Sequence, residues 1–240
     1  MKSLIRLDIS LVQKGIARSQ NEALGIIMAG KVMVDGQVII KAGTRVSSEA
    51  VITVAERMFV SRGGVKLRHA IIEFGLQIDG MVALDIGAST GGFTDCLLTR
   101  GAKRVYAVDV GKGLLDYKIR TDCRVGVLEK TNARYPFVLP KLVDLVVMDV
   151  SFISLEKVIP NCREHMKEGG LLVSLVKPQF EALKIDVPRG GVVKDANVHS
   201  KVLGKFITWA IAQGFRFRNL TTSPLRGASG NREFLVLLQC

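Results

Sequence analysis

Four charged residues stand where a folded chain could use them for chemistry: Lys66, Asp149, Lys177 and Glu233. Asp149 and Lys177 each stand at the end of a strongly apolar segment, and a proline after Lys177 helps to fix where that lysine points. A lysine amine can accept a proton or, as a cation, stabilise a developing negative charge. Each residue alone is typical of a solvated surface, but two charges at the tips of neighbouring apolar strands indicate a site.

Alternating strands and helices must position these side chains. Apolar runs predict parallel strands, the stretches between them have helical periodicity, and the C-terminal part predicts an antiparallel hairpin. The predicted strands are 82–86, 105–109, 126–129, 142–149, 171–176, 215–220 and 232–238. This order indicates an α/β domain with a Rossmann-like sheet, whose ligands are expected at the carboxyl ends of the parallel strands.

The segment 82–94, VALDIGASTGGFT, has the pattern of a strand, a glycine-rich turn and a helix start. Glycine lets a ligand approach the backbone, and free N–H groups at a helix start can face it. The spacing is neither that of a dinucleotide-binding loop nor that of a P-loop, and a tight turn without a ligand is the alternative. Because Asp109 ends the next strand, where it can bind ribose hydroxyls, we predict a nucleoside cofactor. The predicted contacts are Asp85, Gly87, Ser89, Gly91, Gly92, Phe93, Asp109, Glu129 and Asn132.

Residues 1–58 predict a separate small α+β unit. Apolar spacing predicts a helix over 4–14, and a capping-box pattern at 19–22 begins a second helix that stops at Gly30. A hairpin over an Asp-Gly turn joins 31–34 to 37–40, and a closing strand follows at 51–54. We therefore predict a second, larger domain over 59–240.

The composition narrows the class of protein. Residues 1–60 hold 8 basic and 5 acidic residues and the rest hold 26 and 17, so the net charge of +12 is shared. This charge favours a polyanionic partner, with a solvated basic surface as the alternative. Four widely spaced cysteines and no histidine at ligand spacing predict no metal site. A charged N-terminus and no long apolar run predict a cytoplasmic protein without a membrane span.

The N-terminal unit resembles the S4 RNA-binding domain of pseudouridine synthases and tyrosyl-tRNA synthetases. The resemblance rests on R-L-D-x-x-L-V-x-x-G-x-A-x-S-x-x-E-A followed by I-x-x-G-x-V-x-V-D-G. It implies that the second helix and the hairpin lie on structured RNA, with phosphate contacts from Arg18, Lys31 and Lys41 and a weaker one from Lys14. Gln20 stands where the family usually has arginine, so one contact is expected to be missing. A helical protein-docking module is the alternative.

Five segments are similar to one family over most of the chain. They are 61–67, 84–95, 149–155, 177–181 and 230–234. They resemble the TlyA family, also called haemolysin A, in which an S4 domain precedes an FtsJ-like domain of the seven-stranded methyltransferase fold. The resemblance implies an S-adenosylmethionine-dependent 2′-O-methyltransferase that acts on ribosomal RNA or ribosomal subunits and needs no metal. Leu183, where the family has glycine, and the segment 111–116 depart from its pattern.

The resemblance also implies roles for the charged residues. The Lys-Asp-Lys-Glu set of FtsJ-like enzymes falls here on Lys66, Asp149, Lys177 and Glu233. Lys177 would take the proton of a ribose hydroxyl or stabilise the alkoxide, oriented by Asp149 and Glu233. Lys66 would position the target ribose and phosphate, and Arg62 would contact RNA.

Two other functions stay open. The haemolysin name suggests a membrane-active protein, for which the sequence offers no span, no signal and no long cationic amphipathic helix. An RNA-binding assembly factor would keep both domains without catalysis, but the intact charged set argues against it.

Overall fold

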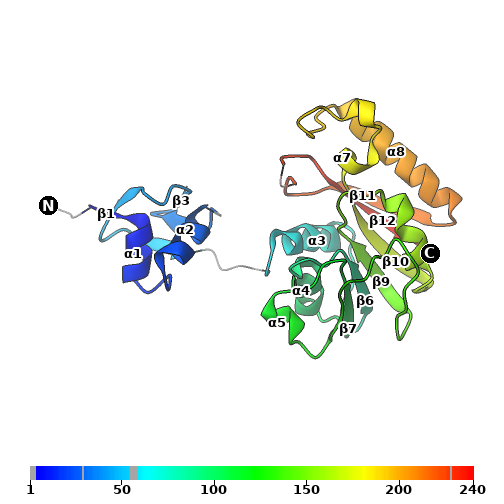
Figure 1. Cartoon of the computed structure of the whole chain (residues 1–240), viewed down its shortest axis with the longest axis horizontal. Helices are drawn as coiled ribbons and strands as arrows, with labels where there is room; N and C mark the ends of the chain where they lie inside the picture. The colour runs from blue at the N-terminus through cyan, green and yellow to red at the C-terminus, as the bar shows by residue number, and fades with distance from the viewer. Residues whose placement is uncertain (1–3, 29, 55–58, 228) are drawn as a thin grey trace. The chain divides into compact units, whose positions relative to one another are not determined.

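The computed structural model describes residues 4–28, 30–54, 59–227 and 229–240, and it divides into two compact units (Figure 1). The units are Met1–Arg57 and Met58–Cys240. The predicted domain boundary at 58/59 adjoins residues 55–58, which lie outside the described part. That boundary stays a prediction.

The smaller unit packs two helices against short strands. The helices are α1 (Leu7–Gln13) and α2 (Gln20–Met28), and the strands are β1 (Leu4–Arg6), β2 (Val32–Val34), β3 (Gln37–Ile39), β4 (Arg45–Ser47) and β5 (Ile52–Val54). Strand β2 lies between β3 and β5, antiparallel to both. The predicted hairpin is confirmed, with Asp35 and Gly36 both at positive φ, as a tight two-residue turn requires.

The predicted starts of the two helices have different outcomes in the structure. The capping box is confirmed in its main contact, since the Ser19 hydroxyl accepts the Glu22 N–H at 3.2 Å. The helix predicted over 4–14 is wrong at its start, because Leu4–Arg6 form β1 and pair antiparallel with β4. That pairing partner lies about forty residues further along the chain, so helical periodicity could not reveal it.

The larger unit is built on a seven-stranded sheet. Its strands are β6 (Val82–Ile86), β7 (Arg104–Val108), β8 (Val125–Leu128), β9 (Val143–Met148), β10 (Met166–Val176), β11 (Arg216–Thr222) and β12 (Phe234–Gln239), in the order β11-β12-β10-β9-β6-β7-β8. The pairs from β10 to β8 are parallel, and β12 is antiparallel to both its neighbours. All seven predicted strands are confirmed, and β10 begins five residues earlier than predicted.

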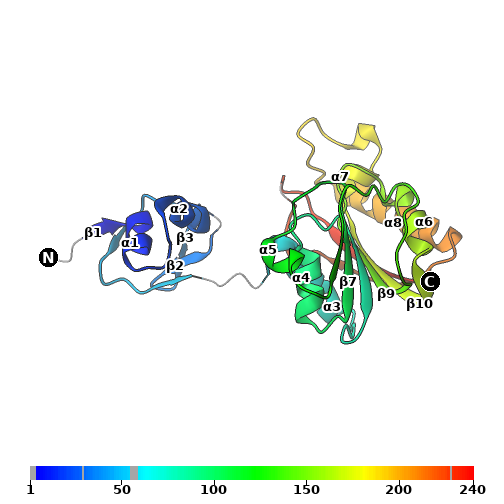
Figure 2. The ribbon, with the colours of Figure 1, turned by 60° about the horizontal axis from the view of Figure 1, so that its bottom comes forward.

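Helices cover both faces of this sheet (Figures 1 and 2). The helical segments are α3 (Arg62–Glu73), α4 (Gly92–Thr99), α5 (Tyr117–Arg120), η1 (Leu155–Lys157), α6 (Ile159–Arg163), α7 (Pro178–Glu181), η2 (Lys184–Asp186) and α8 (Ala196–Ala212). Helices α3, α4 and α5 pack on one face, while α6 and α8 pack on the other. Successive residues of β6 divide between the layers: Ala83 faces α3 and α4, and Leu84 faces α8's side.

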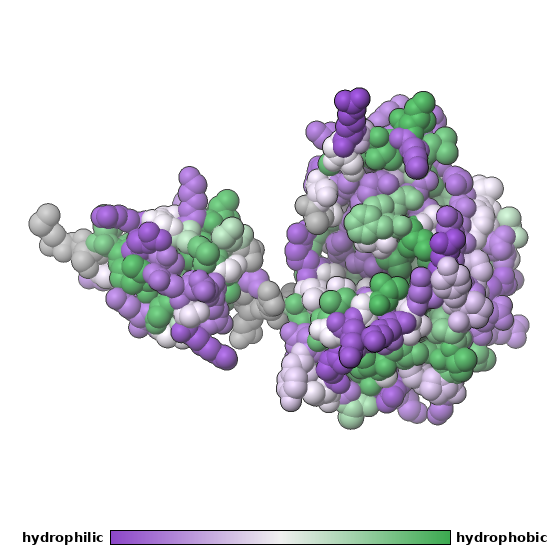
Figure 3. Space-filling model, viewed as in Figure 1, coloured by the Kyte–Doolittle hydropathy of each residue, from purple (hydrophilic) through white to green (hydrophobic). Residues whose placement is uncertain are grey.

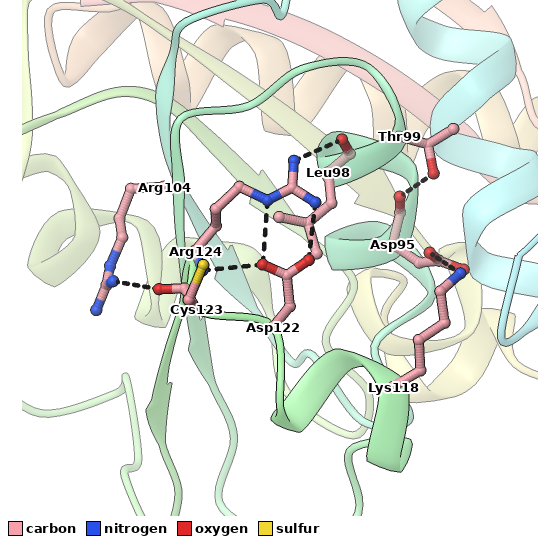
Figure 4. A network of polar contacts seen from close by, with 8 residues as sticks. All are labelled: Asp95, Leu98, Thr99, Arg104, Lys118, Asp122, Cys123 and Arg124. Carbon is pink, nitrogen blue, oxygen red and sulfur yellow. Dashed lines mark hydrogen bonds and ion pairs between the residues drawn. The ribbon is translucent and has the colours of Figure 1, made fainter.

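Polar contacts join α4 to α5 and to the segment before β8 (Figure 4). The Lys118 amine reaches Asp95 at 3.3 Å. Arg124 pairs with Asp122 at 2.7 Å and donates to the Leu98 carbonyl at 3.1 Å. The Lys118 contact holds the first turn of α4, which follows the glycine-rich turn, and the Arg124 contact holds its last turn.

On the face of the larger unit shown in Figure 3, hydropathy does not single out one patch. Hydrophilic and apolar side chains are interspersed over the visible face of the larger unit (Figure 3). The charged residues singled out from the sequence gather instead at the carboxyl ends of the parallel strands.

Candidate active site

Strand register brings the predicted catalytic residues to one edge of the sheet. Val176 is paired with Phe234 across β10 and β12, so Lys177 and Glu233, the next residues outward, lie at adjacent strand ends. Asp149 follows β9, which is the other neighbour of β10. Lys66 joins them from the first turns of α3, through its contact with Glu233.

Lys66 and Glu233 form a buried ion pair. The Lys66 amine lies 2.5 Å from Glu233 Oε2, and their side chains are 9% and 3% exposed. A Cβ added to Gly227 would come within 2.5 Å of Glu233 Oε1, so this glycine leaves the room that the carboxylate occupies. We expected Glu233 to orient Lys177, but its ion-pair partner is Lys66.

Lys177 and Asp149 form the second pair, which is more open. The Lys177 amine lies 2.7 Å from Asp149 Oδ1 and donates to the Ser151 hydroxyl at 2.8 Å. Lys177 is buried, whereas the Asp149 side chain is 22% exposed. The expected contact between Asp149 and Lys177 is therefore present, and its acidic partner can be reached from outside.

A cavity of about 340 Å³ opens beside this second pair. We call it the first cavity. Asp149 and Ser151, which both hold Lys177, are part of its wall. Four of the predicted cofactor contacts also line it, namely Gly87, Ser89, Asp109 and Asn132. The volume is within the range of small-molecule sites.

Asp109 organises the loops around the first cavity. Its Oδ2 accepts the Ser89 N–H and its Oδ1 accepts the Gly111 N–H, both at 2.8 Å. Each carboxylate oxygen has two lone pairs, so each keeps the capacity to accept one more donor. The geometry thus allows Asp109 to hold the glycine-rich turn and to bind a hydroxyl.

The glycines of the turn serve mainly to pack it. A Cβ on Gly87, at φ +80°, would lie 2.6 Å from the Asp149 carbonyl, and one on Gly92 would lie 2.1 Å from Ser61 Oγ. Gly91 faces Leu115, which precedes α5, and Ile119 within α5, and the Phe93 ring is buried under α3. Gly91, Gly92 and Phe93 do not line the first cavity, and their part in cofactor binding stays a prediction.

Asp85 and Glu129 also lie outside the walls of the first cavity. Asp85 is fully buried, accepts the Thr94 hydroxyl at 2.6 Å through Oδ2, and its Oδ1 has no hydrogen-bond partner among the described residues. Burial, with a contribution from the charge of Asp149, raises the pKa of Asp85 to about 7. Glu129 is paired with Arg120, which lowers its pKa, and it accepts the Gly113 N–H.

The predicted RNA contacts fall in both units. Arg18 precedes α2, Lys31 precedes β2 and Lys41 follows β3, and the side chains of Arg18 and Lys41 are exposed. Lys14, the weaker candidate, donates to the Ala50 carbonyl at 3.0 Å. Arg62 begins α3 and donates to the Arg226 carbonyl at 2.6 Å, so it helps to hold the loop that precedes Glu233.

Two residues of the site were not predicted from the sequence. Ser151 holds Lys177, and Phe152 is 90% exposed at φ +62°, a conformation that is strained for a large side chain. The Phe152 ring lies 5.0 Å from that of Phe180. The signal available in the sequence was an aromatic residue directly after a serine, four positions beyond the end of a buried strand.

The described residues contain neither a metal-binding cluster nor a membrane-spanning helix. No group of three or more histidine, cysteine, aspartate or glutamate side chains there could hold a metal ion. No helix in that part of the chain is long and apolar enough to cross a membrane.

The fold and the site define the larger unit as a seven-stranded methyltransferase domain. Residues 59–240 match the family model of FtsJ-like methyltransferases, and residues 5–52 match that of the S4 domain. Hemolysin A of Brachyspira hyodysenteriae is 41% identical over 97% of this chain and 98% of that protein. The 16S/23S rRNA (cytidine-2'-O)-methyltransferase TlyA of Mycobacterium tuberculosis is 44% identical over 98% and 89%. The chain belongs to the TlyA (haemolysin A) family.

Solved structures agree with this family and fold. A hemolysin-named protein from Streptococcus thermophilus has a TM-score of 0.77 at 38% identity, and the superposition covers 100% of this chain and 89% of that protein's chain. The N-methyltransferase NodS of Bradyrhizobium japonicum has a TM-score of 0.51 at 17% identity, over 75% of this chain and 97% of its own. The second likeness shows the fold alone.

Proposed function

We propose that this protein is an S-adenosylmethionine-dependent 2′-O-methyltransferase that modifies ribose in ribosomal RNA. The observation that carries the proposal is the Lys177 amine, whose two partners, Asp149 and Ser151, line the first cavity. Relatives named rRNA (cytidine-2'-O)-methyltransferase and the S4 match support the substrate class. Ribosomal subunits are then the partners, and no stable membrane association or metal is part of the proposal.

The first cavity fits S-adenosylmethionine. Its apolar wall, which includes Val108, Val110 and Leu114, suits an adenine ring, and Asp109 has lone pairs left for ribose hydroxyls. The carboxylates of Asp109 and Asp149 complement a cationic ligand. When bound, S-adenosylmethionine supplies a methyl group on a positively charged sulfur, which an oxygen nucleophile can attack.

Lys177 is the residue that acts on the target hydroxyl. A ribose 2′-hydroxyl is a weak acid, so its oxygen needs a proton acceptor or a neighbouring cation as it attacks. A charged lysine amine has three N–H donors, and two of them are directed at Asp149 and Ser151. The remaining position of the Lys177 nitrogen can take the hydroxyl proton when the amine is neutral, or stabilise the alkoxide when it is charged.

Lys66 and Glu233 support this step without accepting the proton. The Glu233 side chain, which is 3% exposed, holds the Lys66 amine, and Glu233 lies at the strand end next to Lys177. We assign Lys66 to positioning the target ribose. In the smaller unit, Arg18, Lys31 and Lys41 supply RNA affinity and placement.

The proposal is tested with Lys177→Ala and Lys177→Arg in single-turnover methylation of 30S and 50S subunits that lack the modification. We expect Lys177→Ala to lose about 100-fold or more in rate, the range of general acid–base catalysis, with S-adenosylmethionine affinity unchanged by calorimetry. Lys177→Arg should fail as well, because a guanidinium does not accept a proton at neutral pH. Near-normal rates for Lys177→Arg would make Lys177 an electrostatic clamp, and full activity of Lys177→Ala would refute the assignment.

A further inference from the structure

A second cavity of about 750 Å³ adjoins the first cavity, and the two share Arg134, Phe152 and Ile153 in their walls. Three cationic residues line this second cavity: Arg134, Lys157 and Lys184. Its wall contains no aspartate or glutamate, and none of the three cations forms an ion pair within the described part of the chain. An uncompensated positive charge of this kind favours an anionic occupant.

Two acidic residues close to this wall in sequence are engaged elsewhere, and a third, Asp186, does not line the second cavity and forms no ion pair within the described residues. Glu181 accepts the Ser154 hydroxyl at 2.7 Å and the Leu155 N–H at 2.8 Å, one with each oxygen. Burial raises the pKa of Glu181. Glu156 pairs with Lys205 of α8 at 3.4 Å. The positive charge of the second cavity is therefore left for a ligand.

Aromatic side chains accompany these cations. Phe152 and Phe180 line the second cavity with their rings 5.0 Å apart, and Phe152 is held almost fully exposed. Cations that follow a backbone and aromatics that stack on bases are the combination by which proteins bind single-stranded nucleic acid. The second cavity has both within one wall.

We propose that the second cavity binds the 3′-phosphate of the methylated nucleotide and the nucleotide that follows it. This inference rests on the proposed 2′-O-methylation. The 2′-oxygen and the 3′-phosphate are carried by adjacent ribose carbons. A phosphate held by Lys157 and Lys184 therefore presents the neighbouring 2′-oxygen at the wall shared with the first cavity. Asp149 and Ser151, which hold the Lys177 amine, line the first cavity, where Ser151 directly precedes Phe152 of the shared wall.

Lys157→Glu and Lys184→Glu test the inference, with Lys103→Glu as the matched control. All three lysines are exposed, and Lys103 directly precedes β7, at the amino end of that strand and away from the carboxyl ends where the cavities lie. With unmodified 30S and 50S subunits, Lys157→Glu and Lys184→Glu should each raise KM about tenfold with kcat changed less than threefold. Each should also lower the slope of log affinity against log salt concentration by about one, the change expected for one lost phosphate contact. Lys103→Glu should stay within twofold of wild type, and an equal loss in this control would overturn the inference.

A direct probe is a fluorescein-labelled tetranucleotide that ends in cytidine with either a 3′-hydroxyl or a 3′-phosphate. Wild-type protein should bind the 3′-phosphate form about tenfold more tightly, and Lys184→Glu should abolish the difference. Equal binding of both forms by wild type would overturn the inference. If wild type transfers no methyl group to either subunit, the proposed function itself fails. If wild type is active and both variants keep its KM, only the second cavity's role fails.

Discussion

The two lysine–carboxylate pairs of the active site differ in how far water can reach them. In the Lys66–Glu233 pair both side chains are less than 10% exposed. In the Lys177–Asp149 pair the carboxylate is 22% exposed, borders the first cavity and shares its lysine with Ser151. The same two residue types are thus closed in one place and accessible in the other.

This difference separates a pair that holds the structure from a pair that can react. Removing one partner of a closed pair leaves a buried charge without compensation, whereas water can replace a partner that borders a cavity. The two lysine side chains are equally buried, at 9% exposed, so the pairs differ in their carboxylates and in the cavity that Asp149 and Ser151 line. We therefore propose that the pair beside the cavity is the reactive one and that the closed pair fixes the strand end beside it.

The largest expected effect comes from breaking the closed pair. Lys66→Met should lower the free energy of unfolding by about 3–5 kcal/mol, because Glu233 would stay buried without its cation. Lys177→Met should cost about 1 kcal/mol or less, since Asp149 can be hydrated from the cavity. Urea unfolding of both variants measures this contrast. Equal losses of stability would show that the two pairs do not differ as described.

A smaller effect is expected from displacing the closed pair without removing its charges. Gly227→Ala would place a Cβ within 2.5 Å of Glu233 Oε1 and push the carboxylate away from its position. We expect the methylation rate to fall by roughly 10- to 100-fold, the range for a misplaced catalytic group. Gly190→Ala is the control, because its Cβ would meet nothing within 4 Å. A rate for Gly227→Ala equal to that of this control would contradict the prediction.

Asp109 lies outside both pairs and tests cofactor binding separately from chemistry. Asp109→Ala leaves the N–H groups of Ser89 and Gly111 without their acceptor. The affinity for S-adenosylmethionine should fall by about 1–3 kcal/mol, the usual penalty for such a loss. Calorimetric titration measures it, with thermal unfolding as the check that the variant is folded. An unchanged affinity in a folded variant would remove Asp109 from the cofactor site.

The last prediction concerns Asp85, whose pKa is raised by burial and also by the charge of Asp149. The folded-state pKa is about 7 against an ordinary value of 3.8, so between these values the folded protein holds one more proton than the unfolded chain. Stability due to neutral Asp85 is therefore lost as the pH rises through this window. Asp85→Asn cannot ionise, so its stability relative to wild type should increase between pH 4 and pH 8. A pH-independent difference in urea unfolding would contradict this.

Local signals in the sequence accounted for most elements and for the positions of the charged residues. The strand, glycine turn and helix at 82–99, the Asp-Gly hairpin and the cap at Ser19 depend on neighbours within a few residues, and all are present. The errors occur where distant partners decide. Leu4–Arg6 are a strand because they pair with Arg45–Ser47. The early start of β10 similarly depends on pairing between Met166 and Val143 of β9.

By itself, the sequence determined which charged residues are candidates for chemistry, because residue type and position near a predicted strand or helix end are local properties. It named Lys66, Asp149, Lys177 and Glu233. Only the tertiary structure decided which lysine meets which carboxylate, since Lys66 and Glu233 are 167 positions apart and meet through the order of the strands. The structure likewise decided which pair water can reach. Burial depends on every element that packs around a side chain, and no local pattern contains that information.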